Sequence, residues 1–221
     1  NCIKSFTFKI FNIFANQTVG IMKETKDFIL STSLLLFLQK SYREVTMKEI
    51  VQATGLSKGA VYHYFTGKEE LFKEIVLMFF NMGAMDYSAF PKYSLKDFID
   101  KYIYTIEKSF KQINVMMGGD ENEEVSFNFF FIMFEAMKRF PEMLEIEAEQ
   151  YRNDMKVWER VIENARKSKE IVSHTTNTEI ANLFLYCTDG VFIRALNSNK
   201  QVKYSTKLQE AFYSLYENLM T

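Results

Sequence analysis

Residues Val45–Ile75, VTMKEIVQATGLSKGAVYHYFTGKEELFKEI, contain two short helix signatures joined by a glycine turn. Thr46 followed three residues later by Glu49 is a capping-box pattern, which predicts that a helix begins there. Gly55 predicts the end of that helix, because glycine enters the left-handed backbone conformation without steric cost. Ser57 predicts the start of the second helix. A helix, a glycine-containing turn and another helix are the sequence form of a helix-turn-helix.

The second of these helices carries small, basic and hydroxylated side chains on its outer face. Lysine and hydroxyl groups suit phosphate oxygens and base edges, and a glycine lets the helix backbone come close to a partner. Any one of these residues would fit a solvated helix face equally well, but the whole string favours contact with DNA. The residues concerned are Ser57, Lys58, Gly59, Tyr62, His63 and Tyr64.

The pattern T-x-x-x-I-x-x-x-x-G-x-S-K-G-x-x-Y-x-Y-F-x-x-K-E-x-L, from Thr46 to Leu71, resembles the DNA-binding signature of the TetR family of bacterial transcriptional regulators. The resemblance extends upstream to the first-helix core and to the aromatic residue before the capping threonine. Ser41 departs from it, because the family usually has glycine there. The upstream residues that match are Ile29, Ser33, Leu36, Phe37 and Tyr42.

The resemblance implies an all-α protein with a three-helix DNA-binding head and a larger helical domain for ligand binding and dimerisation. Only two prolines, eight glycines and long periodic apolar segments agree with this fold class. We expect a helix-turn-helix domain over residues 22–77 and an effector-binding and dimerisation domain over residues 78–221. Residues 1–21 precede Met22, which begins a normal family N-terminus, so we interpret them as a non-native extension.

Charge gives the DNA-binding interpretation little additional support. The net charge is −1, and residues 22–80 contain eight lysines and arginines against seven acidic residues. We therefore expect a few placed phosphate contacts and an affinity that falls steeply as salt rises.

The resemblance further implies a homodimer that places two recognition helices in successive major grooves of a palindromic operator, about 34–36 Å apart. It gives Lys68, at the start of the third helix, a phosphate contact; the alternative is a surface ion pair with Glu24 or Glu44. The candidate contacts to double-stranded DNA are Thr46, Lys48, Ser57, Lys58, Gly59, Tyr62, His63, Tyr64 and Lys68.

Aromatic and methionine-rich helices follow in the second half of the chain. The helix expected over Val125–Phe140 is apolar almost all round, which is typical of a central helix. Such helices either line a cavity for an apolar effector or form a filled core, and both readings stay open. The candidate effector-binding residues are Phe98, Tyr102, Phe127, Phe131, Phe134 and Trp158.

The last two helices are expected at 180–196 and 208–219, each with an apolar face of helical period. The resemblance implies that they pair with their copies as a four-helix bundle. The alternative is an internal helical hairpin in a monomer. The candidate dimer-interface residues are Phe184, Cys187, Val191, Phe192, Phe212 and Tyr216.

The sequence contains few features that would indicate another class of protein. Cys2 and Cys187 form no metal-ligand cluster and suggest a reducing cytoplasm. The acidic loop Asp120–Glu124 departs from a calcium loop, since Val125 stands where glycine is needed. We therefore expect no metal and no cofactor. No apolar run approaches the ~20 residues that span a bilayer.

The two histidines accompany no phosphate loop or nucleophile elbow, so we expect no enzyme. The function that we predict is a ligand-responsive DNA-binding transcriptional regulator. It acts as a repressor that a small apolar or amphipathic effector releases from its operator. The alternative is a DNA-binding chromosome-organising or partner-binding protein of the same fold, without local gene regulation.

Overall fold

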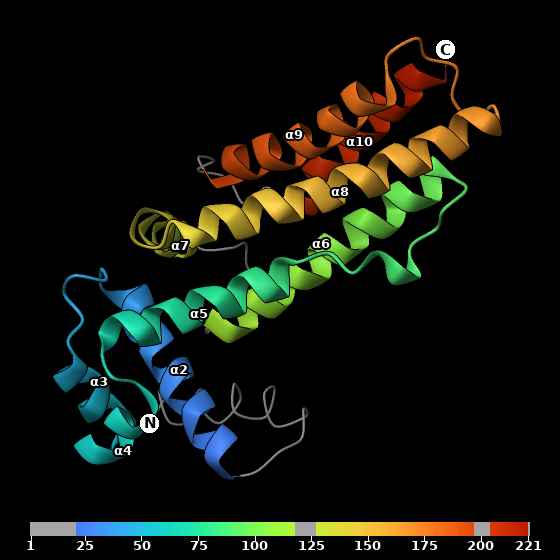
Figure 1. The fold of residues 1–221 in the computed structure, drawn as a ribbon. Helices are drawn as coiled ribbons and strands as arrows, with labels where there is room; N and C mark the ends of the chain where they lie inside the picture. The colour runs from blue at the N-terminus through green and yellow to red at the C-terminus, as the bar shows by residue number, and fades with distance from the viewer. Residues whose placement is uncertain (1–20, 118–126, 197–203, 221) are drawn as a thin grey trace. The chain divides into compact units, whose positions relative to one another are not determined.

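The computed structural model describes residues 21–117, 127–196 and 204–220, and every regular element in these ranges is helical (Figure 1). This confirms the predicted all-α fold class. Most of the extension 1–21 and the loop Asp120–Glu124 lie outside the described residues. The elements are α2 (Ile21–Gln39), α3 (Met47–Thr54), α4 (Lys58–Tyr64), α5 (Lys68–Gly83), the short 3-10 helix η1 (Tyr87–Ala89), α6 (Leu95–Met117), α7 (Phe127–Arg139), α8 (Glu142–Lys167), α9 (Asn177–Leu196) and α10 (Tyr204–Leu219).

The helices pack into two compact units, each built from separate stretches of chain. The first takes the chain up to Met82 together with residues 112–144, and the second takes 83–111 and 145–221. Helix α7 therefore belongs with α2 to α5. Helix α5 runs unbroken past residue 77, where we placed the domain boundary, because Phe79 and Phe80 are buried like the earlier turns of the helix. The functional division at that point stays a prediction.

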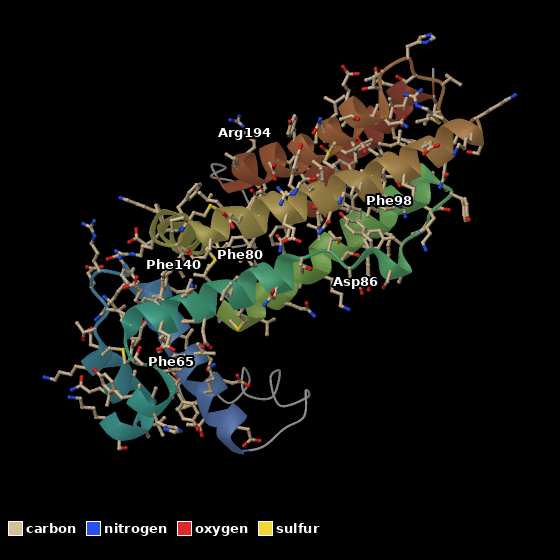
Figure 2. All side chains as sticks on the ribbon, in the orientation of Figure 1. Phe65, Phe80, Asp86, Phe98, Phe140 and Arg194 are labelled. Atoms are coloured by element: carbon tan, nitrogen blue, oxygen red, sulfur yellow. The ribbon has the colours of Figure 1, made fainter. Side chains whose placement is uncertain are left out.

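In the first unit, α2 packs against α3 and α7. The first unit's aromatic side chains meet around Phe72 of α5. Its ring centroid lies 5.0 Å from that of Phe37, 4.7 Å from that of Tyr42 and 6.2 Å from that of Phe140. Figure 2 marks Phe140 at the end of α7. Burying each such side chain contributes roughly 1.5–3 kcal/mol, so this cluster ties α7 to the helix-turn-helix.

In the second unit, α9 and α10 run side by side (Figure 1), and the core forms around Trp158 of α8. The Trp158 ring lies 4.8 Å from Phe98 and 4.8 Å from Phe184, measured between ring centroids. Phe212 of α10 completes the cluster at 5.0 Å from Phe184. Phe98, Phe184 and Phe212 have at most 1% exposed surface, so the helices are joined through one aromatic core.

The start of α6 is capped from a distant part of the chain. The carboxylate of Glu170 accepts hydrogen bonds from the backbone N–H groups of Leu95 and Lys96, at 3.0 and 2.9 Å, and from the Tyr216 hydroxyl at 3.0 Å. A negative charge at a helix N-terminus is favourable, because unpaired N–H groups and partial positive charge gather there. Glu170 therefore links the loop after α8 to both α6 and α10.

Candidate nucleic-acid interface

The first helix of the predicted pair is held by the capping box that the sequence indicates. The Thr46 hydroxyl accepts from the Glu49 N–H at 3.2 Å, and the Glu49 carboxylate accepts from the Thr46 N–H at 2.8 Å. Glu49 also binds the Lys40 ammonium at 2.7 Å. These hydrogen bonds, first the one to Lys40 and then those to Thr46, lower the pKa of Glu49 to about 2. The carboxylate is therefore ionised, and the start of α3 is stable at neutral pH.

The turn between α3 and α4 depends on Gly55. Its φ is +67°, in the left-handed region that side chains other than glycine rarely adopt. Ser57 then caps α4, with its hydroxyl accepting from the Ala60 N–H at 3.1 Å. Within the first unit, α4 packs against the core through Val61 and Phe65, which have no exposed surface. Figure 2 marks Phe65 just after α4. Because this side of α4 is buried, the opposite face of the helix points toward solvent.

That opposite face is exposed and rich in hydrogen-bond donors. Lys58, Gly59, Tyr62 and His63 are all exposed, while Tyr64 is half-buried. The Lys58 ammonium lies 5.5 Å from the centroid of the Tyr62 ring, a cation–π contact across one turn. A Cβ placed on Gly59 would meet no atom within 4 Å. Packing within the protein therefore does not require glycine at position 59.

Of the threonine and serine hydroxyl groups predicted to contact DNA, one has its proton engaged within the described part of the protein and the other does not. The hydroxyl proton of Thr46 is donated to the Glu49 carboxylate at 2.9 Å, so the capping box uses it. The Ser57 hydroxyl only accepts within α4, and its proton has no acceptor among the described residues. Lys48 is exposed on α3 and takes part in no ion pair in the described part of the chain.

Lys68 has a role within the protein that the sequence did not indicate. Its ammonium donates to the carbonyl oxygens of Tyr42 and Val45, at 2.7 and 2.6 Å, and lies 4.3 Å from the Tyr42 ring centroid. Burial, and then the positive charge of Arg139, lower its pKa. Lys68 does not form the alternative ion pair with Glu24 or Glu44; it binds two carbonyl oxygens instead. One N–H of the ammonium remains for a phosphate contact, which stays a prediction.

The loop before Tyr42 forms without the glycine that the family usually has. The N–H and the hydroxyl of Ser41 both donate to the Glu44 carboxylate, at 2.8 and 2.6 Å. These bonds lower the pKa of Glu44. Among the described residues other than glycine, only Lys169 has a positive φ, so Ser41 requires no left-handed conformation. A serine–carboxylate pair therefore closes this turn.

The six candidate effector-binding residues are divided between the two units. Phe98, Tyr102 and Trp158 lie together in the second unit and are at most 4% exposed. Their rings pack directly on one another, with 5.1 Å between the centroids of Tyr102 and Trp158. Phe131 and Phe134 lie on α7 in the first unit and are 64% and 63% exposed. The expectation that this helix is central is therefore wrong at both positions, and the side chain of Phe127 lies outside the described residues.

The predicted dimer residues mostly face the core of their own subunit. Phe184 and Phe212 have no exposed surface, and Tyr216 is 7% exposed. Cys187, Val191 and Phe192 are half-buried against the same core. A side chain without exposed surface cannot contact a second molecule, so the choice of Phe184 and Phe212 is corrected, while the other four positions stay predictions. The homodimer itself stays a prediction.

One contact beside the helix-turn-helix has no signal in the sequence. The Arg139 guanidinium of α7 lies 3.9 Å from the Tyr42 ring centroid and binds Glu135 at 2.7 Å. Lys73 of α5 also pairs with Glu142. Arg139 and Glu135 are four residues apart, but Tyr42 with Arg139 and Lys73 with Glu142 are far apart in the chain, and no local pattern indicates those two contacts.

The described ranges contain neither a metal-binding cluster nor a membrane-spanning helix. No group of three or more histidine, cysteine or acidic side chains is arranged there to hold a metal ion. Of the helices in those ranges, none combines the length and the apolar character needed to cross a bilayer.

Comparison with known proteins identifies the head. The family described as bacterial regulatory proteins, tetR family, matches residues 29–75, the segment that forms most of α2, all of α3 and α4, and the start of α5. This segment therefore matches the DNA-binding region of the TetR family, over about a fifth of the chain. The TetR-family match thus falls on the residues that build the exposed face of α4.

Curated relatives match over part of the chain only. The HTH-type transcriptional regulator AcrR of Shigella flexneri is 38% identical over 61 residues, which cover 28% of each chain. IcaR of Staphylococcus aureus (strain Newman), the negative transcriptional regulator of the icaADBC biofilm operon, is 24% identical over 107 residues, 44% of this chain and 56% of IcaR. The chain thus spans between about a quarter and a half of the length of these two relatives.

Two solved structures share the fold over nearly the whole chain. GusR of Salmonella enterica superposes with a TM-score of 0.58 at 20% identity and covers 91% of this chain and 100% of its own. The complex of SmeT with triclosan superposes with a TM-score of 0.57 at 16% identity, covering 88% of this chain and 90% of SmeT. Sequence identities of 16–20% show that the fold is shared, and they carry no information about ligand or function.

Proposed function

We propose that this chain is a DNA-binding transcriptional repressor that a small molecule releases from a palindromic operator. The observation that carries the proposal is the exposed face of α4. Lys58, Tyr62 and His63 present donors there, beside a glycine that packing within the protein does not require. A helix of this kind fits a major groove, where side chains reach base edges and phosphates.

A dimer is needed to place two α4 helices on one operator, and the exposed apolar residues of α9 supply a surface for it. Leu183, Tyr186 and Ile193 are 46%, 59% and 54% exposed. With Gly190 they follow a three–four–three spacing, which puts them on one stripe of the helix. A Cβ on Gly190 would meet no atom within 4 Å, so a second helix could approach closely there.

Leu183→Glu should convert the dimer into a monomer, because a charge would be buried in the interface. Size-exclusion chromatography with light scattering measures the mass directly. Leu144→Glu is the matched control, since Leu144 is 51% exposed on α8 and lies outside the stripe. A Leu183→Glu protein that keeps the mass of a dimer would remove α9 from the interface.

We place the effector in the second unit, near the polar groups around Trp158. The Trp158 N–H is buried and has no hydrogen-bond partner among the described residues. Asp154, one helical turn earlier, is partly buried and accepts a hydrogen bond from the Tyr87 hydroxyl at 2.9 Å. Buried polar groups among aromatic rings fix the orientation of small ligands. The fold relative SmeT is known in complex with triclosan, which supports a small aromatic effector.

Release requires the effector to favour one arrangement of the two heads over the other, since a ligand shifts an equilibrium only by its difference in affinity. The relatives named above are transcriptional regulators, and IcaR is a negative one. This favours local regulation over the chromosome-organising alternative.

Fluorescence anisotropy on DNA from upstream of the chain's own gene, with random DNA as competitor, tests the proposal. We expect binding that resists the competitor and weakens with salt. Tyr62→Ala should lower the affinity for operator and random DNA alike, by about tenfold, through loss of a backbone contact. Tyr93→Ala, at a 79% exposed tyrosine outside the helix-turn-helix, should change neither affinity.

Equal affinity for upstream and random DNA would contradict site-specific repression at that locus. Full binding by the Tyr62→Ala protein would show that α4 does not meet DNA through this face.

A further inference from the structure

The first unit contains a cavity that the proposed repressor mechanism does not use. It measures about 300 Å³ and lies between α7, α5, the end of α2 and the loop before α3. Every lining residue belongs to the first unit. A cavity of roughly 150 Å³ already admits a benzene ring, and small-molecule sites begin near 300 Å³. The cavity therefore has room for a molecule of one or two aromatic rings.

The lining is chiefly aromatic. Phe37 and Phe72 supply buried rings, and Phe131 adds a ring that is 64% exposed at the α7 side. Aromatic rings pack well against other flat rings, in offset or edge-to-face arrangements. The walls therefore suit a planar aromatic ligand better than a flexible polar one.

Of the described cations around the cavity, Arg43 is the one whose charged group no side chain or carbonyl oxygen binds. Glu135 in the lining is neutralised by Arg139 at 2.7 Å. The Lys68 ammonium, over the Tyr42 ring, is held by two carbonyl oxygens. Arg43 also lines the cavity, is exposed, and takes part in no ion pair within the described residues. A guanidinium binds a carboxylate through two parallel hydrogen bonds.

Two of the residues that line the cavity with Arg43, namely Tyr42 and Ser41, carry hydroxyl groups. The Tyr42 hydroxyl makes no hydrogen bond in the described part of the chain, and burial raises its pKa, so it stays protonated as a donor. The Ser41 hydroxyl already donates to Glu44. Tyr42 thus offers the cavity a second donor for an anion, besides Arg43.

We propose that the cavity binds a small aromatic carboxylate. Its rings pack between Phe37, Phe72 and Phe131, and its carboxylate binds Arg43 and the Tyr42 hydroxyl. The ligand joins α7 to the loop that leads into the helix-turn-helix. This site is separate from the effector site proposed in the second unit.

Isothermal titration calorimetry of the full chain tests which ligand charge the cavity prefers. The three probes share a naphthalene ring and differ in the charge of their substituent. The probes are 2-naphthoate, 2-naphthol and 2-naphthylmethylammonium. We expect one naphthoate per chain, at least tenfold weaker binding of naphthol and no binding of the cation, because charge-assisted hydrogen bonds are about twice as strong as neutral ones. Equal binding of all three, or no naphthoate binding at 1 mM, about the weakest range of specific affinity, would overturn the proposal.

Variants with matched controls then locate the site. Arg43→Gln should weaken naphthoate about tenfold and leave naphthol unchanged, whereas Arg152→Gln, at an exposed arginine of the second unit, should change neither. Phe131→Ala should weaken both ligands about fivefold through lost ring contact, while Phe134→Ala, equally exposed on the same helix, should have no effect. Circular dichroism confirms that each variant is folded.

Unchanged naphthoate affinity in Arg43→Gln, or equal losses in Phe131→Ala and Phe134→Ala, would place the ligand elsewhere and overturn the assignment. Calorimetry uses no DNA, so these outcomes are independent of the repressor proposal.

Discussion

At the scale of single residues, several side chains that the sequence marks for DNA are already engaged within the protein. Thr46 donates its hydroxyl proton to Glu49, and Lys68 gives two of its N–H groups to carbonyl oxygens. Lys58 and Tyr62 form a cation–π pair, and neither makes a hydrogen bond or an ion pair within the described part of the chain. A substitution at Thr46 or Lys68 would therefore disturb the fold as well as any DNA contact, whereas Lys58 and Tyr62 report on DNA alone.

Gly59→Ala should separate DNA affinity from stability. Because a Cβ at this position meets no atom within 4 Å, the free energy of unfolding should stay unchanged or rise by up to about 1 kcal/mol, as helical alanine replaces glycine. Operator affinity should fall at least tenfold, since the added methyl group would hold α4 away from the groove. Urea unfolding and fluorescence anisotropy measure the two quantities. Unchanged affinity would exclude a close approach at Gly59.

Asp154→Asn should stabilise the protein at neutral pH. Burial raises the pKa of Asp154 to about 6; the hydrogen bond from Tyr87 opposes the shift, and the carboxylates of Asp189 and Glu147 add to it. The folded state therefore holds this proton more tightly than the unfolded state, and stability falls as the pH rises from about 4 to 6. Asparagine can still accept from Tyr87 but carries no charge.

We expect the Asp154→Asn gain to be roughly 2 kcal/mol at pH 7.5, after allowing for partial exposure, and to vanish toward pH 4. Urea unfolding across this pH range measures it. Glu217→Gln, at an exposed carboxyl, is the control and should show no such trend. A constant difference between wild type and Asp154→Asn would contradict a raised pKa.

At the scale of elements, local residues cap α3 and α4. The end of α5 depends on tertiary burial, and the start of α6 depends on both a local and a distant residue. Thr46, Gly55 and Ser57 form the caps that the sequence predicts. Helix α5 continues to Gly83 because Phe79 and Phe80 are buried. The cap of α6 combines the local Ser94, whose hydroxyl accepts from the Asp97 N–H at 3.1 Å, with the distant Glu170.

Glu170→Gln should lower the free energy of unfolding by about 1–2 kcal/mol, because an amide keeps one acceptor oxygen and loses the charge that strengthens three hydrogen bonds. Urea unfolding measures the loss. Glu163→Gln is the control, since Glu163 forms only an exposed pair with Lys167, and it should cost less than about 0.5 kcal/mol. Equal effects of the two substitutions would show that Glu170 is not a significant cap.

At the scale of the whole molecule, a net charge of −1 provides no general attraction to DNA. Affinity must then come from a few placed contacts, each repeated in both subunits of the proposed dimer. The salt dependence of binding counts these contacts, because each phosphate contact adds about −0.9 to the slope of log affinity against log salt.

Lys58→Ala should reduce the magnitude of that slope by about 2, one contact for each subunit. Anisotropy titrations at several salt concentrations give the slope. Lys156→Ala removes the same charge from an exposed position on α8 and should leave the slope unchanged. An equal change in both variants would mean that overall charge, rather than a placed contact, sets the salt dependence.

Local sequence was enough to determine the helices, the glycine turn and the outward face of α4. Caps and left-handed glycines act between residues that are neighbours in the chain, and the alternation of buried and exposed positions on a short helix follows from its period. Gly55 and Ser57 accordingly lie as predicted, and Val61 and Phe65 form the buried side of α4.

Only the tertiary structure decided which apolar faces are buried and which are left exposed. An apolar stripe looks the same in the sequence whether its own subunit covers it or not. Phe184 is therefore buried although it was predicted at an interface, and Phe131 is exposed although its helix was predicted to be central. The same holds for Lys68 and Arg139, whose positions around Tyr42 depend on segments distant in the chain being folded together.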